Sequence, residues 1–380
     1  MKVKIEKIVH GGYGLARTEY GVCLVPLSVP GDVLDVECSE SEKLSFGWIK
    51  KIITPSRYRR DPRCPVFGMC GGCDFDHMDY LYELEMKVDV LMEDLSRIAK
   101  IMNMDIDRVI KSEMYGYRNH AQFKVGGKGD IGFFYKKSHE VVPLPPGGCR
   151  LLSSAINNFI GKISPDIIFS RGGFRVRSNA RNIIFQKGIP GLKDDTHCYQ
   201  YAGGLKFRLK IDDFFQVNTY VTGKWVNTIE SYLDPQNNDI VADLFCGSGL
   251  ISLSIAKKVK FVTGIELNRN PVNSARHNAK WNNIPNVSFL RANSDRAVDL
   301  INSADKIIVD PPRSGLTEKL INKITSLEPA VIVYASCDTA TFARDMLIFT
   351  KYGYFLKKIS LIDMFPRTKH SEVVALIKKN

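Results

Sequence analysis

The stretch Asp239-Ile-Val-Ala-Asp-Leu-Phe-Cys-Gly-Ser-Gly249 joins a short apolar run to a glycine-containing turn, and Leu250–Lys257 continues with helical periodicity. An apolar strand followed by such a turn and a helix is typical of the first unit of a doubly wound α/β sheet. The glycines allow the backbone of the turn to approach a ligand closely. We therefore expect a Rossmann-like domain over residues 232–380, with a ligand bound at this turn.

The alternation of strands and helices continues towards the C-terminus. We expect strands at Lys260–Ile265, Lys306–Val309 and Val331–Ala335, and a helix over Pro271–Asn282. Open sheets of this kind bind their ligands outside the carboxyl ends of the strands. The residues that follow each strand are therefore the candidates for chemistry.

An acidic residue at the end of the second strand indicates which cofactor the turn binds. Glu266 lies 23 positions after Asp243, where a carboxylate can accept hydrogen bonds from both ribose hydroxyls. A dinucleotide site would need G-x-G-x-x-G to hold a pyrophosphate, whereas this turn begins with an acid and has a single G-x-G. That pattern favours S-adenosylmethionine, with its charged sulfonium, over NAD. Cys246, in the turn itself, is predicted to be a packing residue.

Two further segments follow later strands. Asp310-Pro-Pro-Arg-Ser-Gly315 follows the fourth strand and Tyr334-Ala-Ser-Cys-Asp338 spans the end of the fifth. Asp-Pro-Pro occurs in methyltransferases that act on exocyclic amines, usually before an aromatic residue, but Arg313 stands there in this chain. Cys337 supplies a soft nucleophile, which amine methylation does not need.

A thiol beside the cofactor suits methylation of carbon 5 of a pyrimidine. That carbon becomes nucleophilic only when a thiolate adds to carbon 6, and a base must later remove the proton from carbon 5. We predict Cys337 as the nucleophile and Glu372 as the base, with His370 as the competing base. Cytosine-5 methyltransferases carry Pro-Cys after the fourth strand, where this chain has Pro311-Pro312.

Three thiols stand close together in Cys64-Pro-Val-Phe-Gly-Met-Cys-Gly-Gly-Cys73, with gaps of five and two residues, and Cys149 is a candidate fourth ligand. This spacing favours a [4Fe-4S] cluster held by Cys64, Cys70, Cys73 and Cys149. Zinc is the alternative, although no second short Cys or His pair is present. A radical methylase would need C-x3-C-x2-C and an open iron.

The first 55 residues predict a small OB-like barrel. Short strands at Lys2–Ile8, Gly21–Val25, Val33–Cys38 and Gly47–Ile53 alternate with glycine and proline turns. The segment around Pro30-Gly-Asp32 resembles the TRAM module of RNA-modifying enzymes. We therefore assign 1–55 to an RNA-binding TRAM barrel.

Residues 56–231 predict a central α+β domain that carries the cysteine loop. Helical periodicity runs over Tyr80–Ala99, and strands are expected at 122–125, 131–135, 173–177 and 182–186. Basic and aromatic residues alternate on these strands, as in surfaces that grip a phosphate backbone and stack bases. They include Arg118, Lys124, Arg175 and Arg177 beside Tyr117 and Phe123.

Charge and composition narrow the class of partner. The chain has 53 Lys and Arg against 41 Asp and Glu, a net charge of +12, which favours a polyanion such as RNA. No apolar run is long enough to span a bilayer, and the N-terminus lacks the features of a signal peptide, so we expect a cytoplasmic location without membrane association. Nine cysteines in 380 residues favour metal or catalytic roles over a secreted disulfide scaffold.

Taken with these motifs, the chain resembles, over its whole length, the RNA uridine-5 methyltransferase family, and in particular its TRAM-bearing branch with four cluster cysteines. The segment Phe214-Phe-Gln-Val-Asn218 matches that family's F-x-Q-V-N motif. The resemblance implies a monomeric S-adenosylmethionine-dependent enzyme with Phe214 at the pocket for the target base. It also implies cofactor contacts from Gln216, Phe245, Glu266, Asn293 and Asp310, a nucleophilic Cys337 and Glu372 as general base.

Two segments depart from the family pattern. The family's S-C-N-P is Ser336-Cys-Asp-Thr339 here, and the Asn that commonly follows its G-x-G is Leu250. By analogy the target is expected in 23S ribosomal RNA, with a transfer RNA uridine as the alternative. A non-catalytic RNA-binding iron-sulfur protein is the alternative of another class.

Overall fold

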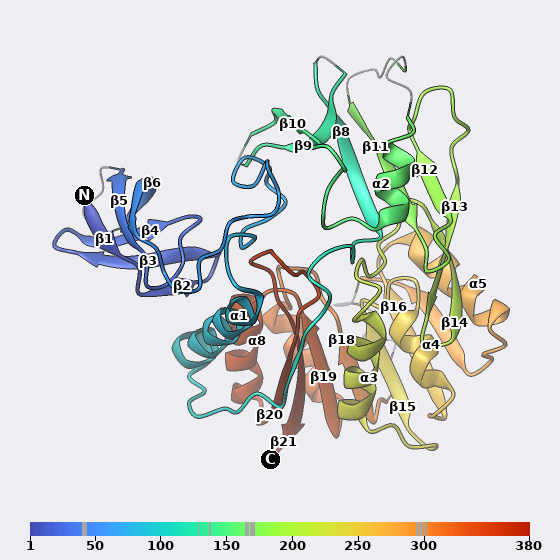
Figure 1. The fold of residues 1–380 in the computed structure, drawn as a ribbon. Coiled ribbons are helices and arrows are strands. Elements are labelled where there is room, and N and C mark those ends of the chain that lie inside the picture. The colour runs from blue at the N-terminus through green and yellow to red at the C-terminus, as the bar shows by residue number, and fades with distance from the viewer. Residues whose placement is uncertain are drawn as a thin grey trace.

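The computed structural model describes residues 1–39, 44–127, 129–136, 138–163, 167, 172–293, 296, 299, 301 and 303–380. Figure 1 shows a small N-terminal β-unit, an upper antiparallel sheet and a large lower α/β unit. None of the helices in these ranges is long and apolar enough to cross a membrane.

The N-terminal sheet has the strand order β1-β5-β6-β4-β3-β2. Its strands are β1 (Lys2–Lys4), β2 (Lys7–Val9), β3 (Tyr13–Thr18), β4 (Gly21–Val25), β5 (Val33–Cys38) and β6 (Leu44–Thr54). Ile5 donates to the Asp32 carbonyl and Glu6 to the Leu15 carbonyl, so the chain between β1 and β2 joins the two ends of the sheet. The sheet curls round a small apolar core that includes Val25 and Leu34. This confirms the barrel-like N-terminal unit expected from the sequence.

The upper sheet is antiparallel, with the order β10-β9-β8-β11-β12. It contains β8 (His120–Val125), β9 (Ile131–Phe134), β10 (Val141–Pro143), β11 (Gly172–Ser178) and β12 (Ile184–Lys187), and α2 (Ser154–Ile160) packs on it. A separate two-stranded ribbon, β13 (His197–Ala202) with β14 (Leu205–Lys210), follows and packs against α5 (Arg269–Trp281).

The lower sheet has eight strands in the order β17-β16-β15-β18-β19-β21-β20-β7. Its strands are β15 (Ile240–Leu244), β16 (Phe261–Glu266), β17 (Val287–Arg291), β18 (Lys306–Val309), β19 (Val331–Ser336), β20 (Tyr354–Ile362), β21 (Glu372–Lys379) and β7 (Arg108–Ile110). The helices are α1 (Tyr80–Asp94), the π-helical turn η1 (Leu95–Ala99), α3 (Thr222–Leu233), α4 (Leu250–Ala256), α5 (Arg269–Trp281), α7 (Glu318–Ser326) and α8 (Thr339–Lys351). The strands β15 to β19 are parallel, and β21 runs antiparallel to β19. This is the α/β fold that the turn at 243–249 predicts.

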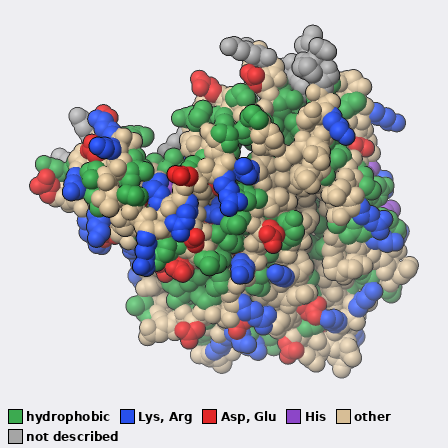
Figure 2. Space-filling model, in the orientation of Figure 1, with side chains coloured by type: hydrophobic (Ala, Val, Ile, Leu, Met, Phe, Trp, Pro, Cys, Tyr) green, Lys and Arg blue, Asp and Glu red, His purple; other side chains and the backbone are tan. Residues whose placement is uncertain are grey.

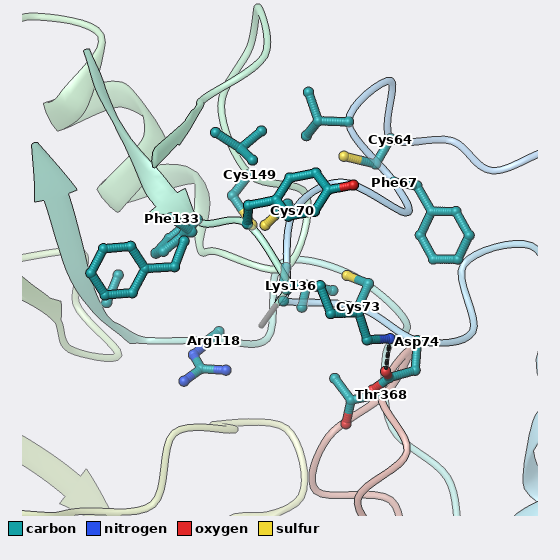
Figure 3. A pocket seen from close by; sticks show the side chains of 18 of the residues that line it. Cys64, Phe67, Cys70, Cys73, Asp74, Arg118, Phe133, Lys136, Cys149 and Thr368 are labelled. Atoms are coloured by element: carbon teal, nitrogen blue, oxygen red, sulfur yellow. Dashed lines mark hydrogen bonds and ion pairs between the residues drawn. The ribbon is translucent and has the colours of Figure 1, made fainter. Parts of the chain in front are cut away.

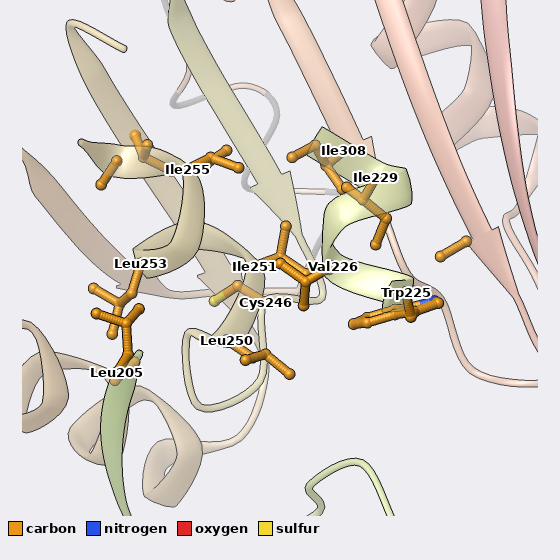
Figure 4. Packing of buried hydrophobic residues seen from close by; sticks show 14 of the residues in the cluster. Leu205, Trp225, Val226, Ile229, Cys246, Leu250, Ile251, Leu253, Ile255 and Ile308 are labelled. Atoms are coloured by element: carbon orange, nitrogen blue, oxygen red, sulfur yellow. The ribbon is translucent and has the colours of Figure 1, made fainter. Parts of the chain in front are cut away.

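Apolar side chains from α3 and α4 fill one face of the lower sheet. Trp225, Val226 and Ile229 of α3 pack with Ile251 of α4 and with Ile308 of β18 (Figure 4). The helix α3 was not predicted from the sequence, and residue 232, the predicted start of the C-terminal domain, lies at the end of this helix. On the other face, residues of η1 share a core with α7 and α8. Each of these two cores contains residues from both sides of residue 231, so packing does not separate the chain at that point. The division into domains 1–55, 56–231 and 232–380 stays a prediction.

Candidate active site

The strand ends of the lower sheet bring the predicted reacting residues to one edge. Glu266 ends β16, Asp310 directly follows β18, and Cys337 directly follows β19. Because β21 runs antiparallel, its first residue, Glu372, lies at this same edge, and the register pairs Ser336 with Val373. Residues that are 106 positions apart in the chain, from Glu266 to Glu372, therefore meet at the carboxyl edge of the sheet.

Cys337 lies half-buried on the wall of a cavity of about 210 Å³ that Arg313 and His370 also line. Burial raises the pKa of the Cys337 thiol to about 11, the Glu372 carboxylate adds to this rise, and the Arg313 guanidinium lowers it. Arg313 Nη2 lies 3.2 Å from His370 Nε2. The cation at Arg313 is thus placed where it favours a thiolate, a role that the sequence analysis did not assign to it.

Glu372 is buried beside this thiol. Burial, reinforced by the neighbouring Asp310 carboxylate, raises the pKa of Glu372 well above its usual range, while Trp225 opposes the rise. Burial also raises the pKa of Asp310, to about 7, with Asp243 contributing. A carboxylate with a raised pKa is a stronger base than a solvated one, which suits removal of a carbon-bound proton. Burial, together with the charge of Arg313, lowers the pKa of His370, the competing base, to about 4.

The turn after β15 has the backbone geometry of a close ligand approach. Phe245 has a φ of 64°, and Gly247 and Gly249 also have positive φ values. Asp243 accepts a hydrogen bond from Ser252 through Oδ2, and its Oδ1 is buried without a partner among the described residues. Burial raises the pKa of Asp243 to about 7. A buried carboxylate with an unmatched oxygen is compatible with a cationic ligand.

The other expected cofactor residues have different surroundings. Glu266 Oε1 accepts a hydrogen bond from Asn268 N at 2.7 Å, and Asn293, which is exposed, follows β17 at the same edge. Gln216 is buried in the segment after β14, where its carbonyl accepts from Asn119 Nδ2 at 3.3 Å. Two residues before it, Phe214 is 69% exposed. Its exposure leaves this ring free to contact a ligand.

The four predicted cluster cysteines meet round one cavity of about 900 Å³ (Figure 3). Cys64 N donates to Asp76 Oδ2 at 3.1 Å, and Asn157 brackets Cys149 by accepting from its N–H at 3.1 Å and donating to its carbonyl at 2.9 Å. The backbone amides of Leu151 and Leu152 bond to the Cys149 sulfur and that of Gly72 to the Cys70 sulfur.

Amides directed at sulfur stabilise thiolates, which are the ligands of iron-sulfur clusters. Burial raises the pKa of Cys70, Cys73 and Cys149, which a bound metal would oppose. Within the described ranges, no three His, Cys, Asp or Glu side chains stand close enough together, as placed, to hold a metal ion. The iron-sulfur centre therefore stays a prediction.

The upper sheet corrects part of the predicted RNA surface. Tyr117, Phe123 and Arg177 are buried and cannot meet RNA. The Arg177 guanidinium donates to the carbonyls of Ile211 and Asp213, so it anchors the segment that leads to Phe214. Strand alternation shows which residues share a face, but it does not show that this face is covered by another part of the chain. Arg118, Lys124 and Arg175 are at least partly exposed.

A buried charge network, which the sequence analysis missed, holds the segment before Glu372. Lys87 Nζ contacts Glu83 Oε1 at 2.8 Å and Asp363 Oδ1 at 2.7 Å, and Arg367 Nη1 contacts Glu83 Oε2 at 3.1 Å. The i,i+4 spacing of Glu83 and Lys87 was visible in the predicted helix, but their burial was not. These contacts tie α1 to the residues that present His370 and Glu372.

The N-terminal barrel also reaches the reacting edge. His10 Nδ1 lies 3.4 Å from Asp94 Oδ2, and its Nε2 lies 3.8 Å from Asp338 Oδ2. Thr339 Oγ1 donates to Asp94 Oδ2 at 2.6 Å. Asp338 and Thr339 are two positions where the chain departs from the family's S-C-N-P. In this protein they connect the Cys337 segment with the barrel and with α1.

Comparisons with known proteins agree with this arrangement. A sequence model of the tRNA (uracil-5-)-methyltransferase family matches residues 199–380. An uncharacterized RNA methyltransferase from Aquifex aeolicus is 30% identical over 426 residues, which cover all of this chain and 98% of that protein. A 23S rRNA (uracil(1939)-C(5))-methyltransferase from Legionella pneumophila strain Lens is 30% identical, and the match covers 99% of this chain and 96% of the relative.

Among solved structures, the Pyrococcus abyssi tRNA (uracil-54, C5)-methyltransferase in complex with S-adenosyl-L-homocysteine superposes with a TM-score of 0.78 at 22% identity. The superposition covers 99% of each chain, so the two proteins share their fold throughout. The relatives that are 30% identical over nearly their full length, together with the matching family model, show that the chain belongs to the RNA uracil-5 methyltransferase family.

Proposed function

We propose that this protein transfers a methyl group from S-adenosylmethionine to carbon 5 of a uridine in 23S ribosomal RNA. The observation that carries the proposal is the meeting of Cys337 and Glu372 at the carboxyl edge of the sheet, close enough for the carboxylate to shift the pKa of the thiol. A nucleophile and a base side by side at a strand-end ligand site are what carbon 5 methylation requires.

Cys337 acts first in this mechanism. Its thiolate, favoured by Arg313, forms a bond with carbon 6 of the uracil, and the electron pair of the 5,6 double bond moves to carbon 5 and the carbonyl oxygen at position 4. Carbon 5 then accepts the methyl group. Cys337 is partly exposed on the wall of a cavity. A uracil that has flipped out of the RNA stack can therefore reach the sulfur.

Glu372 acts second. Its carboxylate removes the proton from carbon 5, the 5,6 double bond re-forms, and the bond between carbon 6 and the Cys337 sulfur breaks. Its burial beside Asp310 raises its pKa and so strengthens it as a base.

S-adenosylmethionine supplies an electrophilic methyl group when it is bound. In our proposal Phe245, Glu266, Asn293 and Asp310 hold it at the strand ends, and Gln216 holds it from the segment after β14. The unpartnered Oδ1 of Asp243 and the raised pKa values of Asp243 and Asp310 support a cationic ligand at this edge.

A [4Fe-4S] cluster held by Cys64, Cys70, Cys73 and Cys149 is part of the proposal. Its role would be structural, because four thiolates leave no open iron. The cavity that all four cysteines line, and the amides directed at two of the sulfurs, support this assignment. The cluster would fix the loop of residues 64–73 against the upper sheet, where Gly71 N already donates to Phe134 O at 3.0 Å.

The choice of ribosomal RNA rests on the Legionella relatives, whose name specifies uracil 1939 of 23S rRNA. A transfer RNA uridine is the second candidate, favoured by the name of the family model, which matches residues 199–380. The barrel of residues 1–55 is proposed to contact the RNA outside the target loop, in a monomeric and cytoplasmic enzyme.

The experiment is to map 5-methyluridine in total RNA of a deletion strain, complemented with the wild-type gene or with Cys337→Ala. We expect one or more uridines of 23S rRNA to lose the methyl group and to regain it only with the wild type. Loss of 5-methyluridine from transfer RNA instead would shift the proposal to the second candidate. No change in either RNA would refute the proposed function.

A further inference from the structure

The outward face of the β13–β14 ribbon pairs a ring with a cation at every position. The antiparallel register sets His197 opposite Lys210, Tyr199 opposite Arg208 and Tyr201 opposite Lys206. The alternate residues of the two strands, Cys198, Gln200, Phe207 and Leu209, are buried. The ribbon therefore presents one continuous face of rings and cations, which the sequence analysis did not foresee.

Neighbouring side chains extend this face. The Arg181 guanidinium lies 4.7 Å from the centroid of the Tyr201 ring, and Lys206 Nζ lies 5.8 Å from that of Trp281 on α5. The Tyr199 and Trp281 rings meet edge to face with centroids 5.8 Å apart, yet they remain 38% and 39% exposed. Lys, Arg and His side chains show on this flank, beside α5 (Figure 2).

The positive charge of the face is not balanced locally. In the part of the chain that the structure describes, Arg181, Lys206, Arg208 and Lys210 form no ion pair with a carboxylate. The nearby Asp213 is buried, and its Oδ2 accepts from Lys210 N at 3.2 Å and from Ser274 Oγ at 3.3 Å. Burial, with the Arg208 and Lys210 charges, lowers the pKa of His197.

Asn278 of α5 and Asn282, which directly follows this helix, hold the face in place. Lys206 N donates to Asn282 Oδ1 at 3.0 Å and Arg208 N to Asn278 Oδ1 at 2.8 Å, while Asn282 Nδ2 donates to the Lys206 carbonyl at 2.7 Å. These bonds occupy the free edge of β14 and prevent another strand from adding there. The cations stand at every second residue of the strand, about 6 to 7 Å apart, which is close to the spacing of consecutive phosphates in a nucleic-acid strand.

The position of the ribbon relates it to the reacting edge. Lys210 ends β14 four residues before Phe214. Trp281 ends α5, whose 13 residues begin at the carboxyl edge and extend for about 18 Å. The ring-and-cation face therefore leads from the segment of Phe214 along the flank of the molecule.

We propose that this ring-and-cation face, formed by His197, Tyr199, Tyr201, Lys206, Arg208 and Lys210, is a second RNA-binding surface. The cations contact consecutive phosphates, and the exposed rings stack on unpaired bases of the RNA that flanks the target loop. The inference rests on the proposed function in that the partner is the RNA substrate, and it adds a surface that sets the affinity for long RNA.

The test compares two triple variants with the same change in charge. Lys206→Ala/Arg208→Ala/Lys210→Ala removes the cations of the face, and Lys319→Ala/Lys358→Ala/Lys378→Ala removes three exposed lysines from α7, β20 and β21. The probes are a full-length 23S rRNA transcript and a hairpin cut from it round the methylated uridine. We measure Kd over a range of salt concentrations, and kcat and KM for methyl transfer.

We expect the first variant to bind the transcript roughly ten-fold more weakly, with a salt slope lower by about two, since each lost phosphate contact lowers the slope by 0.7 to 0.9. Its kcat on the hairpin should equal that of the wild type, which also shows that it folds. Lys206→Arg/Lys210→Arg should keep wild-type affinity.

Equal affinity of the two triple variants for the transcript would overturn the proposed surface while leaving the proposed function intact. If the wild type methylates neither probe, the proposed function fails, and the comparison of Kd values still decides whether the face binds RNA. Ultraviolet cross-linking of the wild type to a 4-thiouridine-labelled transcript gives a second readout. Adducts on the peptides of Tyr199 or Trp281 support the surface, and their absence beside adducts elsewhere contradicts it.

Discussion

At the scale of single residues, two cysteines lie at the same edge of the lower sheet, but one is packed in the core and the other faces a cavity. Cys246 is buried in the turn after β15, where its sulfur lies close to Gly264 and the surrounding core includes Phe289. Cys337 opens on a cavity with Arg313 beside it. The sequence predicted that Cys246 packs and Cys337 reacts, because one thiol lies inside the predicted cofactor turn and the other follows a strand. It did not predict Arg313, whose role depends on a contact between two different strand ends.

Arg313→Gln should slow formation of the covalent adduct. Removing the guanidinium raises the pKa of Cys337, so the thiolate fraction falls at any given pH and the rate profile moves to higher pH. We expect a decrease of about ten-fold at neutral pH, since one nearby charge shifts a pKa by about one unit or more. The measurement is the initial rate of adduct formation against pH. Arg313→Lys should restore most of the rate, and an unshifted profile in Arg313→Gln would remove this role.

Glu372→Gln should separate the two halves of the reaction. Addition and methyl transfer precede the step of Glu372, so the variant should accumulate methylated RNA bound to Cys337. Glutamine has nearly the same shape as glutamate and carries no charge into this buried position, so the fold should tolerate it. The adduct is measured as a denaturation-resistant band on a gel. His370→Gln is the control and should turn over, whereas trapping by His370→Gln alone would make histidine the base.

At the scale of elements, the strands and helices with regular patterns were predicted well. Gly21–Val25 and Val33–Cys38 are strands with the expected bounds, and Tyr80–Ala99 is helical throughout, with a π-helical last turn. The helix α3 was missed, although Trp225, Ile229 and Leu233 recur at its helical spacing. How the segment before Glu372 is held could not be predicted, because it depends on Lys87 and Asp363, which lie 276 positions apart.

The cysteine loop makes a prediction at this scale. Cys70→Ser should lose the brown colour and the iron of anaerobically purified protein, together with much of the soluble yield, because the loop organises the face of the upper sheet. Iron and zinc are measured by elemental analysis. Cys38→Ser, which changes a half-buried cysteine outside the loop, should keep the wild-type iron content. Stoichiometric zinc without iron in the wild type would rule out the cluster.

At the scale of the whole molecule, the site is assembled from parts that are far apart in the chain. The barrel contributes His10, α1 contributes Asp94, and the start of α8 contributes Asp338 and Thr339 beside Cys337. The sequence predicted which motifs follow strands, because each motif lies at the end of one strand. It could not predict that the two departures from S-C-N-P contact the barrel and α1, because that contact exists only after distant units pack.

The central claim is that Cys337 forms the covalent bond with the target uridine. The most direct measurement is mass spectrometry of peptides after reaction of the wild type with S-adenosylmethionine and RNA that carries 5-fluorouridine at the target. Fluorine cannot leave as a proton does, so the adduct persists. We predict a methylated fluorouridine on the peptide of Cys337, an unmodified Cys246 peptide, and no adduct in Cys337→Ala. An adduct on Cys246, or one that survives in Cys337→Ala, would contradict the account.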